Sequence, residues 1–388
     1  MRKLACLLAG LSLIGGGAAA QQALTPGTPS ILVWSPQQQS DWYRSIESVY
    51  HVNTIHRGDR VEAMLPAAQS MATTFTHDGR SWSVDDYMQT YKVSGLLVLK
   101  DGKVLLERYG LGRKPTDRWT SFSVAKSVTS TLVGAAIKDG KIKSLNAHVT
   151  DYVPELKGSG YEGVTVRQLL MMSSGVRWNE DYADPNSDVS QAGLTRADDK
   201  AGVNPMVSYM RKLPRARVPG STFNYNTGET DLVGIMVSKA VGKSLADYAS
   251  EKIWKPYGME QDAIWMTDTS GQERGGCCIS MTLRDYGRVG QFILDGGKAQ
   301  GKAILPADWV AQATSKQIDN GGPGYGYFWW MLPGEDYQAV GIFGQSITTF
   351  RKDRVIIVIN SAWPQATGKK LNMERAAFVA ALHAAAVQ

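Results

Sequence analysis

The spacing of apolar and polar residues predicts strands near both ends of the chain and helices between them. Residues 93–99 and 104–109 form two apolar runs on either side of Asp101-Gly102, which is the pattern of a β-hairpin. Residues 121–138 repeat apolar positions at helical spacing, which predicts a long buried helix. The hairpin and the helix should open the ordered body of the protein, which begins near Val61.

Helical spacing dominates the middle of the chain, and strand-like runs return after it. The helical pattern extends over residues 166–270, and a further helix is expected at residues 284–294. Strand-like runs then occupy residues 325–331, 339–350 and 355–360, ahead of an Ala-rich helix from Leu371. Strands at both ends with helices inserted between them indicate one sheet that combines distant segments.

These patterns predict an α/β sandwich in which helices flank an antiparallel sheet, with an inserted helical subdomain. A chain of 388 residues is long enough for one large composite domain or for two domains. We place the α/β domain at residues 61–165 plus 271–388 and the helical subdomain at residues 166–270. The cleft between them is the expected place for a functional site.

The first twenty residues have the order of a secretory signal peptide. Arg2 and Lys3 precede an apolar run at residues 4–14, and three alanines end at Ala20. The run is shorter than the roughly 20 residues that span a bilayer. We therefore expect cleavage after Ala20, a periplasmic or secreted protein without stable membrane insertion, and an N-terminal arm at residues 21–60.

Charge and metal-ligand patterns narrow the classes of function. The formal net charge is +6, but Lys and Arg are scattered along the chain, so the sequence gives no case for nucleic-acid binding. The five histidines have no metal-ligand spacing, and neither Gly-x-Ser-x-Gly nor His-Glu-x-x-His occurs. We expect no metal and no organic cofactor. The sequence does not settle the oligomeric state.

The cysteines exclude a disulfide framework. Cys6 lies in the signal segment, and Cys277 and Cys278 are adjacent to each other. A strained vicinal disulfide is one interpretation of the adjacent pair. The sequence favours the other, two buried thiols beside the Gly275-Gly276 turn, because an unpaired cysteine usually behaves as a small core residue.

A Ser-x-x-Lys motif begins the long helix. A spacing of three places the hydroxyl of Ser123 and the ammonium of Lys126 about one turn apart on one helix face. A serine hydroxyl becomes a strong nucleophile only when a base takes its proton, and burial of a lysine lowers its pKa toward that of a useful base. The motif alone is common, and the alternative is a helix-start serine with a solvated lysine.

A second candidate segment is the turn-rich loop at residues 218–228. A tyrosine in such a loop, here Tyr225, can relay a proton to a leaving group. Asn226 and Thr227 are placed to orient that tyrosine or a substrate. The alternative is a packing tyrosine in a polar turn.

Three separated segments together resemble the serine β-lactamase and penicillin-binding superfamily over residues 85–365. The chain is most similar to the class C-like branch that contains esterases and 6-aminohexanoate-dimer hydrolases. The superfamily segments are Ser121-Phe122-Ser123-Val124-Ala125-Lys126-Ser127, residues 169–178 and Phe223-Asn224-Tyr225-Asn226-Thr227-Gly228. The branch is indicated by residues 178–185, Ile253-Trp254-Lys255-Pro256 and Gly341-Ile342-Phe343-Gly344-Gln345.

The resemblance implies a role for each matching position. Ser123 matches the acylated nucleophile, Lys126 its base, and Tyr225 the tyrosine of a Tyr-x-Asn or Tyr-x-Ser element whose third position is Thr227 here. Tyr182 matches a tyrosine that contacts amide substrates. The backbone N–H groups of Ser123 and Ile342 would form an oxyanion hole, which needs no particular side chain.

The chain also departs from the penicillin-recognising pattern. Val340-Gly341-Ile342 stands where those relatives have Lys-Thr-Gly, and Ser-Asp-Asn is absent from the sequence. The resemblance therefore implies a serine hydrolase of small esters or linear amides rather than an efficient β-lactamase. Two alternatives stay open, a β-lactamase or D,D-peptidase and a non-catalytic binding or sensory protein with the same fold.

Overall fold

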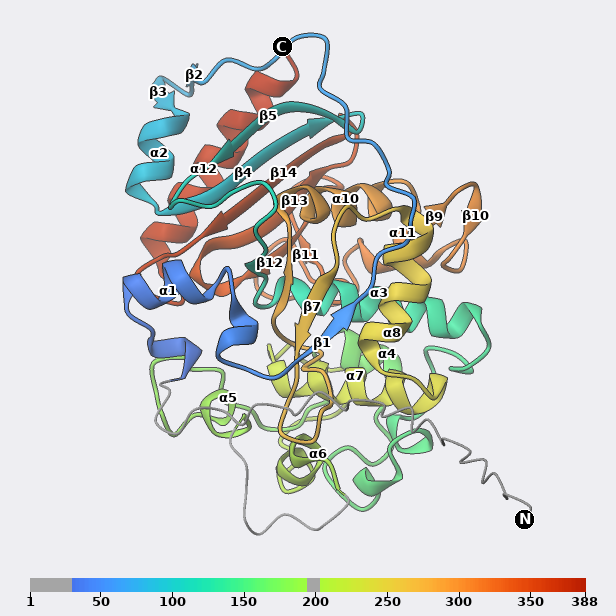
Figure 1. Cartoon of the computed structure of the whole chain (residues 1–388). Coiled ribbons are helices and arrows are strands. Elements are labelled where there is room, and N and C mark those ends of the chain that lie inside the picture. The colour runs from blue at the N-terminus through green and yellow to red at the C-terminus, as the bar shows by residue number, and fades with distance from the viewer. Residues whose placement is uncertain (1–29, 194–202) are drawn as a thin grey trace, which may run out of the picture.

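A six-stranded antiparallel sheet forms the centre of the computed structural model, which describes residues 30–193 and 203–388 (Figure 1). The strand order is β11-β12-β13-β14-β4-β5. The strands are β4 (Val93–Lys100), β5 (Lys103–Tyr109), β11 (Trp330–Met331), β12 (Tyr337–Gly341), β13 (Gln345–Phe350) and β14 (Val355–Ser361). The predicted hairpin is β4–β5, and β4 pairs with β14 from the far end of the chain, so distant segments share one sheet as predicted.

Helices cover both faces of this sheet. On one face lie α12 (Lys369–Ala386) and α2 (Val84–Thr90), and on the other lie α10 (Leu283–Leu294) and α3 (Val124–Lys138). Alternation along β4 explains the two layers, because Val98 belongs to the core under α12 while Leu97 belongs to the core on the α3 side. The predicted α/β sandwich is confirmed.

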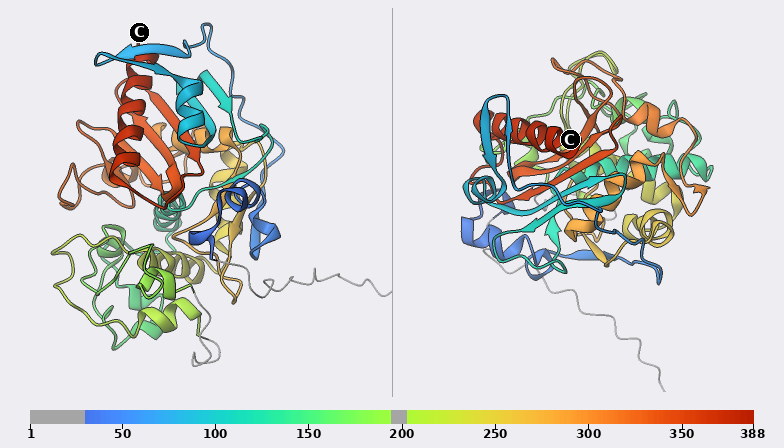
Figure 2. Two further views of the ribbon diagram at one scale, coloured as in Figure 1. Left: turned by 90° about the vertical axis from the view of Figure 1, so that its left-hand side faces the viewer. Right: turned by 90° about the horizontal axis from the view of Figure 1, so that it is seen from above.

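The middle region of the chain forms a series of helices, which are α4 (Val166–Leu170), α5 (Asp188–Gln191), α6 (Pro205–Met210), α7 (Thr227–Val241), α8 (Leu245–Ala249) and α9 (Lys255–Tyr257). Those labelled α4, α5, α6 and α7 lie below the sheet (Figure 1 and Figure 2), while α8 packs beside β1 (Val52–Ile55). The longest of them, α7, begins at the N-cap Asn226 and packs against α3. This contact brings the loop before α7 next to the start of α3.

A second, four-stranded sheet corrects two expectations. Its order is β1-β7-β8-β6, from β1 (Val52–Ile55), β7 (Ala263–Met266), β8 (Ile279–Met281) and β6 (Trp119–Thr120). The helical pattern expected over residues 166–270 was wrong at β7, which is a strand because it pairs on both sides, with β1 and β8. Part of the predicted N-terminal arm is therefore built into the sheet through β1.

The strand-like runs near the end of the chain are also divided differently from the prediction. Residues 339–350 are not one strand, because Phe343 has a φ of 59° and the chain turns between β12 and β13. Residues 325–331 contain only the short β11, since Phe328 has a φ of 62°. The remaining short elements are α1 (Pro36–Trp42), α11 (Trp309–Ala313) and the hairpins β2–β3 (Thr74–His77, Arg80–Ser83) and β9–β10 (Lys298–Ala299, Lys302–Ala303).

The predicted signal peptide and the first residues of the predicted arm lie outside the described residues. Within residues 30–193 and 203–388, no helix combines the length and the apolar character needed to cross a membrane. The division into an α/β domain and a helical subdomain at residues 165–166 and 270–271 stays a prediction.

Candidate active site

Ser123 stands where β6 turns into α3. Phe122 has a φ of 45°, which redirects the chain so that Ser123 becomes the first residue of the turn into the helix. The segment is fixed to β8, because Ser121 N donates to Ile279 O at 2.8 Å and Ile279 N donates to the Ser121 hydroxyl at 3.0 Å. Ser123 is thus held at a rigid corner and lines a cavity of about 770 Å³.

Lys126 lies one turn further along α3, with its side chain directed into the protein. The residue is 1% exposed, and its Nζ donates to Thr227 Oγ1 at 2.9 Å and to Gly276 O at 3.0 Å. Burial lowers the pKa of Lys126 to about 8, although the charges of Glu180 and Asp231 oppose that decrease. A lysine with such a pKa is partly neutral near pH 8 and can act as a base.

A side chain at the acceptor Gly276 would crowd the lysine and its neighbour Thr227. A Cβ atom there would lie 2.9 Å from Lys126 Nζ and 2.8 Å from Thr227 Cγ2. Asp231 holds the turn in place, since its carboxylate accepts a hydrogen bond from Gly276 N at 2.7 Å and pairs with Arg274 Nε at 3.1 Å. The turn is therefore shaped to receive the lysine.

Tyr225 completes the group of predicted catalytic side chains. Lys126 Nζ lies 5.3 Å from the centroid of its ring, and the ring stacks on Trp330 with centroids 5.4 Å apart. Burial raises the pKa of the Tyr225 phenol, while a hydrogen bond with Ser123 lowers it. The structure thus brings Ser123, Lys126 and Tyr225 together, and the tyrosine is a neutral phenol at physiological pH.

The sequence reasoning missed Glu180, which also lines the cavity. Its Oε2 accepts hydrogen bonds from Thr227 N at 3.0 Å and from the indole N–H of Trp178. Its Oε1 accepts from the Tyr182 hydroxyl at 2.7 Å and from the Thr227 hydroxyl. Thr227, which the sequence offered as a substrate-binding residue, connects Lys126 to Glu180, and its contact with substrate stays a prediction. No spacing signal marks Glu180, although it lies two residues before Tyr182 in a segment that carries the resemblance.

The predicted oxyanion-hole segment lies beside the nucleophile. At Gly341 a Cβ atom would lie only 2.4 Å from Ser121 O and 3.1 Å from Phe122 Cβ, so a larger residue could not bring β12 this close. Ile342 follows directly and lines the same cavity as Ser123 and Tyr182. The role of the Ser123 and Ile342 N–H groups as an oxyanion hole stays a prediction.

From Ser123 the cavity extends as a groove between the outer part of the sheet and α12. Gln338 on β12 lies opposite Thr348 on β13, so both project to the same face and form the floor of the groove. Val379 and Ala380 of α12 form a wall. Most of the remaining lining is apolar and includes Trp330, Leu332, Val340, Ile342, Phe350 and Trp363.

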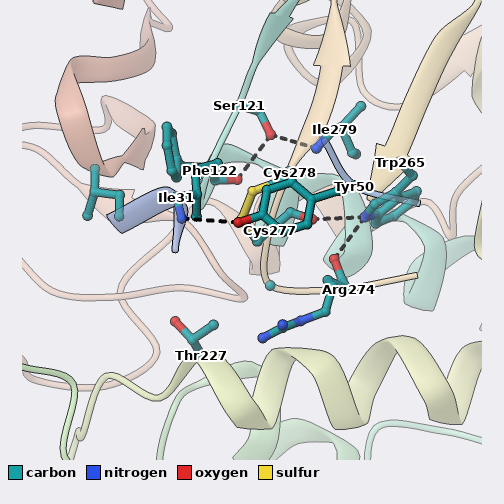
Figure 3. Close-up of a disulfide and its surroundings, with 12 residues drawn as sticks. Ile31, Tyr50, Ser121, Phe122, Thr227, Trp265, Arg274, Cys277, Cys278 and Ile279 are labelled. Carbon is teal, nitrogen blue, oxygen red and sulfur yellow. Dashed lines mark hydrogen bonds between the residues drawn. A yellow bond between two sulfur atoms is a disulfide. The ribbon is translucent and has the colours of Figure 1, made fainter. Parts of the chain in front are cut away.

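The structure corrects the expectation for the two adjacent cysteines. The sequence favoured buried thiols, whereas Cys277 and Cys278 are joined by a disulfide that lies directly after Gly276 (Figure 3). Cys278 has a φ of 74°, a local conformation that no spacing argument anticipates. Trp265 Nε1 donates to Arg274 O at 2.8 Å and to Cys277 O at 3.1 Å, which fixes the turn that contains the pair.

No group of three or more His, Cys, Asp or Glu side chains within the described ranges is arranged to hold a metal ion. The predicted site residues Ser123, Lys126, Tyr225, Tyr182, Thr227 and Ile342 all belong to the cavity or to the network beside it.

Known proteins are similar to this chain in sequence. The family model described as Beta-lactamase matches residues 83–382. A 6-aminohexanoate-dimer hydrolase from Paenarthrobacter ureafaciens is 30% identical over 361 residues, which cover 87% of this chain and 89% of the relative. A Beta-lactamase from Pseudomonas fluorescens is 24% identical and covers 54% of each chain.

Solved structures share the fold. A Bacillus anthracis protein provisionally assigned as a 6-aminohexanoate-dimer hydrolase superposes with a TM-score of 0.77 at 23% identity, covering 88% of this chain and 92% of its own. A point mutant of a class C beta-lactamase gives a TM-score of 0.57 at 18% identity, covering 75% of this chain and 92% of its own.

Proposed function

The chain belongs to the beta-lactamase family and is a serine hydrolase, and from this premise we propose that it cleaves a small ester or a linear amide through an acyl-enzyme on Ser123. One observation carries the proposal. A lysine that is 1% exposed, with a pKa of about 8, lies one turn from the cavity-lining Ser123, and its Nζ is 5.3 Å from the ring centroid of the partly buried Tyr225, which lines the same cavity. This combination supplies a nucleophile, a base and an acid at one place.

In the proposed acylation step, neutral Lys126 accepts the hydroxyl proton of Ser123 while Oγ attacks the substrate carbonyl carbon. The backbone N–H groups of Ser123 and Ile342 stabilise the oxyanion that forms. The carbonyl then re-forms and the bond to the leaving oxygen or nitrogen breaks. Tyr225 gives its phenolic proton to the leaving group and recovers a proton from the Lys126 ammonium. Water attacks the acyl-enzyme by the same route in reverse and restores Ser123.

The groove supports a substrate with a substantial apolar part, although Glu180, Asp336 and Arg375 also belong to its lining. Its walls are mainly aromatic and aliphatic, and the segment Val340-Gly341-Ile342 has no charged side chain where penicillin-recognising relatives have a lysine. The relative named 6-aminohexanoate-dimer hydrolase matches over most of both chains, which supports linear amides as one substrate class. Tyr182, beside Ser123 in the cavity, is the candidate contact for the amide.

The second candidate function is a β-lactamase or D,D-peptidase. The similarity to a Beta-lactamase over about half of each chain favours it. The missing Lys-Thr-Gly counts against it, because that element normally helps to bind the β-lactam carboxylate.

A substrate panel tests the proposal and separates the candidates. Turnover of p-nitrophenyl acetate, 6-aminohexanoate dimer and nitrocefin is measured for the wild type and for Ser123→Ala. We expect ester or amide turnover that Ser123→Ala abolishes, with nitrocefin turned over poorly. Nitrocefin as the best substrate would favour the second candidate, and turnover that survives in Ser123→Ala would contradict the proposal.

We also propose that the protein is exported to the periplasm or the medium, on the basis of residues 1–20. N-terminal sequencing of the protein from a native or homologous host should find Gln21 first. A cytoplasmic protein that retains Met1 would contradict this.

A further inference from the structure

Glu180 accepts four hydrogen bonds, and two of them come from groups that can only donate. The backbone N–H of Thr227 and the indole N–H of Trp178 meet Oε2, and neither group can act as an acceptor. The hydroxyls of Thr227 and Tyr182 meet Oε1. Four donors on two oxygens fit a carboxylate, which accepts and does not donate when it is ionised.

This arrangement fixes the direction of the next hydrogen bond. Because the Thr227 proton is committed to Glu180, the Thr227 oxygen can only accept from Lys126 Nζ, 2.9 Å away. The other partner of Nζ, Gly276 O at 3.0 Å, is a carbonyl and also only accepts. A neutral lysine amine has two N–H bonds and one lone pair, so both N–H bonds are used by these two partners. The lone pair is left for the remaining direction.

We propose that Glu180 is a positioning residue which, through Thr227, turns the lone pair of neutral Lys126 toward the Ser123 proton. The inference rests on the proposed acyl-enzyme chemistry, in which Lys126 is the base. Glu180 touches neither the nucleophile nor the carbonyl in this account, and it acts only through the hydroxyl of Thr227.

The other charged or titratable groups around Lys126 do not take this role. Asp231 on α7 binds Gly276 N and Arg274, and so reaches Lys126 only through the Gly276 turn. Arg274 is a cation and lowers the pKa of Lys126. Tyr225 presents its ring to Nζ, and Tyr182 binds Glu180. Within the described part of the chain, Glu180 is the carboxylate that a single hydroxyl links to the lysine.

The substitution Glu180→Gln should reverse the Thr227 hydrogen bond. The amide oxygen has to face the two fixed N–H donors, so the NH₂ group faces the Thr227 and Tyr182 hydroxyls and donates to them. The Thr227 proton is then free to point at the lone pair of Lys126. The base is misdirected, although its nitrogen has hardly moved.

The same substitution also has an electrostatic effect, which shifts the pKa of Lys126 and with it the pH midpoint of the reaction. Glu180 favours the ammonium form of Lys126, so removal of its charge lowers the pKa of Lys126. An opposite charge at this range shifts a pKa by about 1 unit or more. Glu180→Gln should therefore reduce the rate at alkaline pH and at the same time move the midpoint of the pH profile to lower pH.

The test measures the rate of covalent labelling of Ser123 by a fluorophosphonate between pH 5 and pH 10, which requires no knowledge of the substrate. For Glu180→Gln we expect a plateau rate about tenfold lower, the effect of roughly one lost hydrogen bond, and a midpoint about 1 pH unit below that of the wild type. Thr227→Val should lower the plateau similarly, and Thr227→Ser, which keeps the hydroxyl, should restore it.

The matched control is Glu155→Gln. Glu155 pairs with Lys239, which lies twelve residues and about 18 Å along α7 from Thr227. The substitution Glu155→Gln therefore removes one carboxylate charge far from Lys126. It should leave both the plateau and the midpoint unchanged. A structural defect alone would lower the plateau of Glu180→Gln without moving the midpoint downward, and that result overturns the proposal.

The ¹³Cε resonance of Lys126, assigned by its loss in Lys126→Met, gives its titration midpoint independently of labelling. A midpoint in Glu180→Gln equal to or above that of the wild type also overturns the proposal. Failure of the proposed function is recognised separately, because the wild type would then not be labelled at Ser123 at any pH. If Glu180→Gln does not fold, the Thr227→Val and Thr227→Ser pair decides, and equal plateau rates in the two would contradict the inference.

Discussion

The substitution Gly276→Ala tests whether the position of Lys126 Nζ controls the reaction. Gly276 is the acceptor of one of the two hydrogen bonds of Nζ, and its own φ is not in the left-handed region, so alanine introduces crowding and no backbone strain. The new Cβ would lie 2.9 Å from Nζ and 2.8 Å from Thr227 Cγ2. Nζ, Thr227 or the turn then has to move.

The expected magnitude follows from these contacts. Real Cβ contacts are longer than 3.0 Å, so a shift of several tenths of an ångström is needed, and of the three atoms within 3.0 Å, which also include Thr227 O at 2.9 Å, Lys126 Nζ is the end of a flexible side chain. Overpacking of this kind costs about 1–3 kcal/mol of stability. A displacement approaching 1 Å at a reacting group lowers a rate by about 100-fold.

The assay compares acylation by a fluorophosphonate with thermal unfolding in Gly276→Ala and in a matched control, Gly290→Ala. At Gly290 a Cβ atom would meet Ile347 Cγ2 at 2.9 Å and Ile356 Cγ2 at 3.0 Å, which is similar crowding in the core under the sheet. Both variants should lose similar stability, but only Gly276→Ala should lose acylation. Equal acylation rates in the two folded variants would refute the reasoning.

Three further predictions concern single groups. The labelling rate of the wild type should rise with pH and have a midpoint near pH 8, because burial lowers the pKa of Lys126 to about 8 and only the neutral amine accepts a proton; a rate independent of pH between 6 and 10 would contradict this. Tyr225→Phe should reduce amide turnover by about 10²–10⁴-fold. It should reduce p-nitrophenyl ester turnover much less, because p-nitrophenolate leaves without a proton. Equal losses for both substrates would exclude Tyr225 as the acid. Burial raises the pKa of Glu229 from 4.5 to about 8, so its contribution to stability is complete below pH 4.5 and is lost as pH rises toward 8. Glu229→Gln should therefore gain stability relative to the wild type over this window, by up to about 1.4 kcal/mol per pH unit in denaturant unfolding, and a difference independent of pH would contradict the assignment.

The sequence predicted the features that depend on local spacing. The β4–β5 hairpin is set by Asp101-Gly102 between two apolar runs, and α3 is set by its apolar repeat. The proximity of Ser123 and Lys126 follows from their spacing on one helix. Tyr225 was placed beside them by resemblance, and the packing of α7 on α3 is what brings it there.

The features that the sequence did not predict depend on distant contacts or on single backbone angles. Glu180 gains its role from Thr227, 47 residues away, and no local pattern joins the two. Likewise β7 became a strand because β1, more than 200 residues earlier, pairs with it. The chain breaks between β12 and β13 at Phe343, which has a positive φ. The disulfide-bonded pair likewise contains a residue with a positive φ, Cys278.

The central claim is that Ser123 is acylated and that Lys126 is its base. Intact-mass analysis of the protein after treatment with a fluorophosphonate, for the wild type, Ser123→Ala and Lys126→Ala, tests it most directly. The account predicts one adduct on the wild type, located at Ser123 by peptide mapping, none on Ser123→Ala, and greatly slowed labelling of Lys126→Ala. A folded wild type that takes up no label, or a Ser123→Ala variant labelled as fast as the wild type, would contradict it.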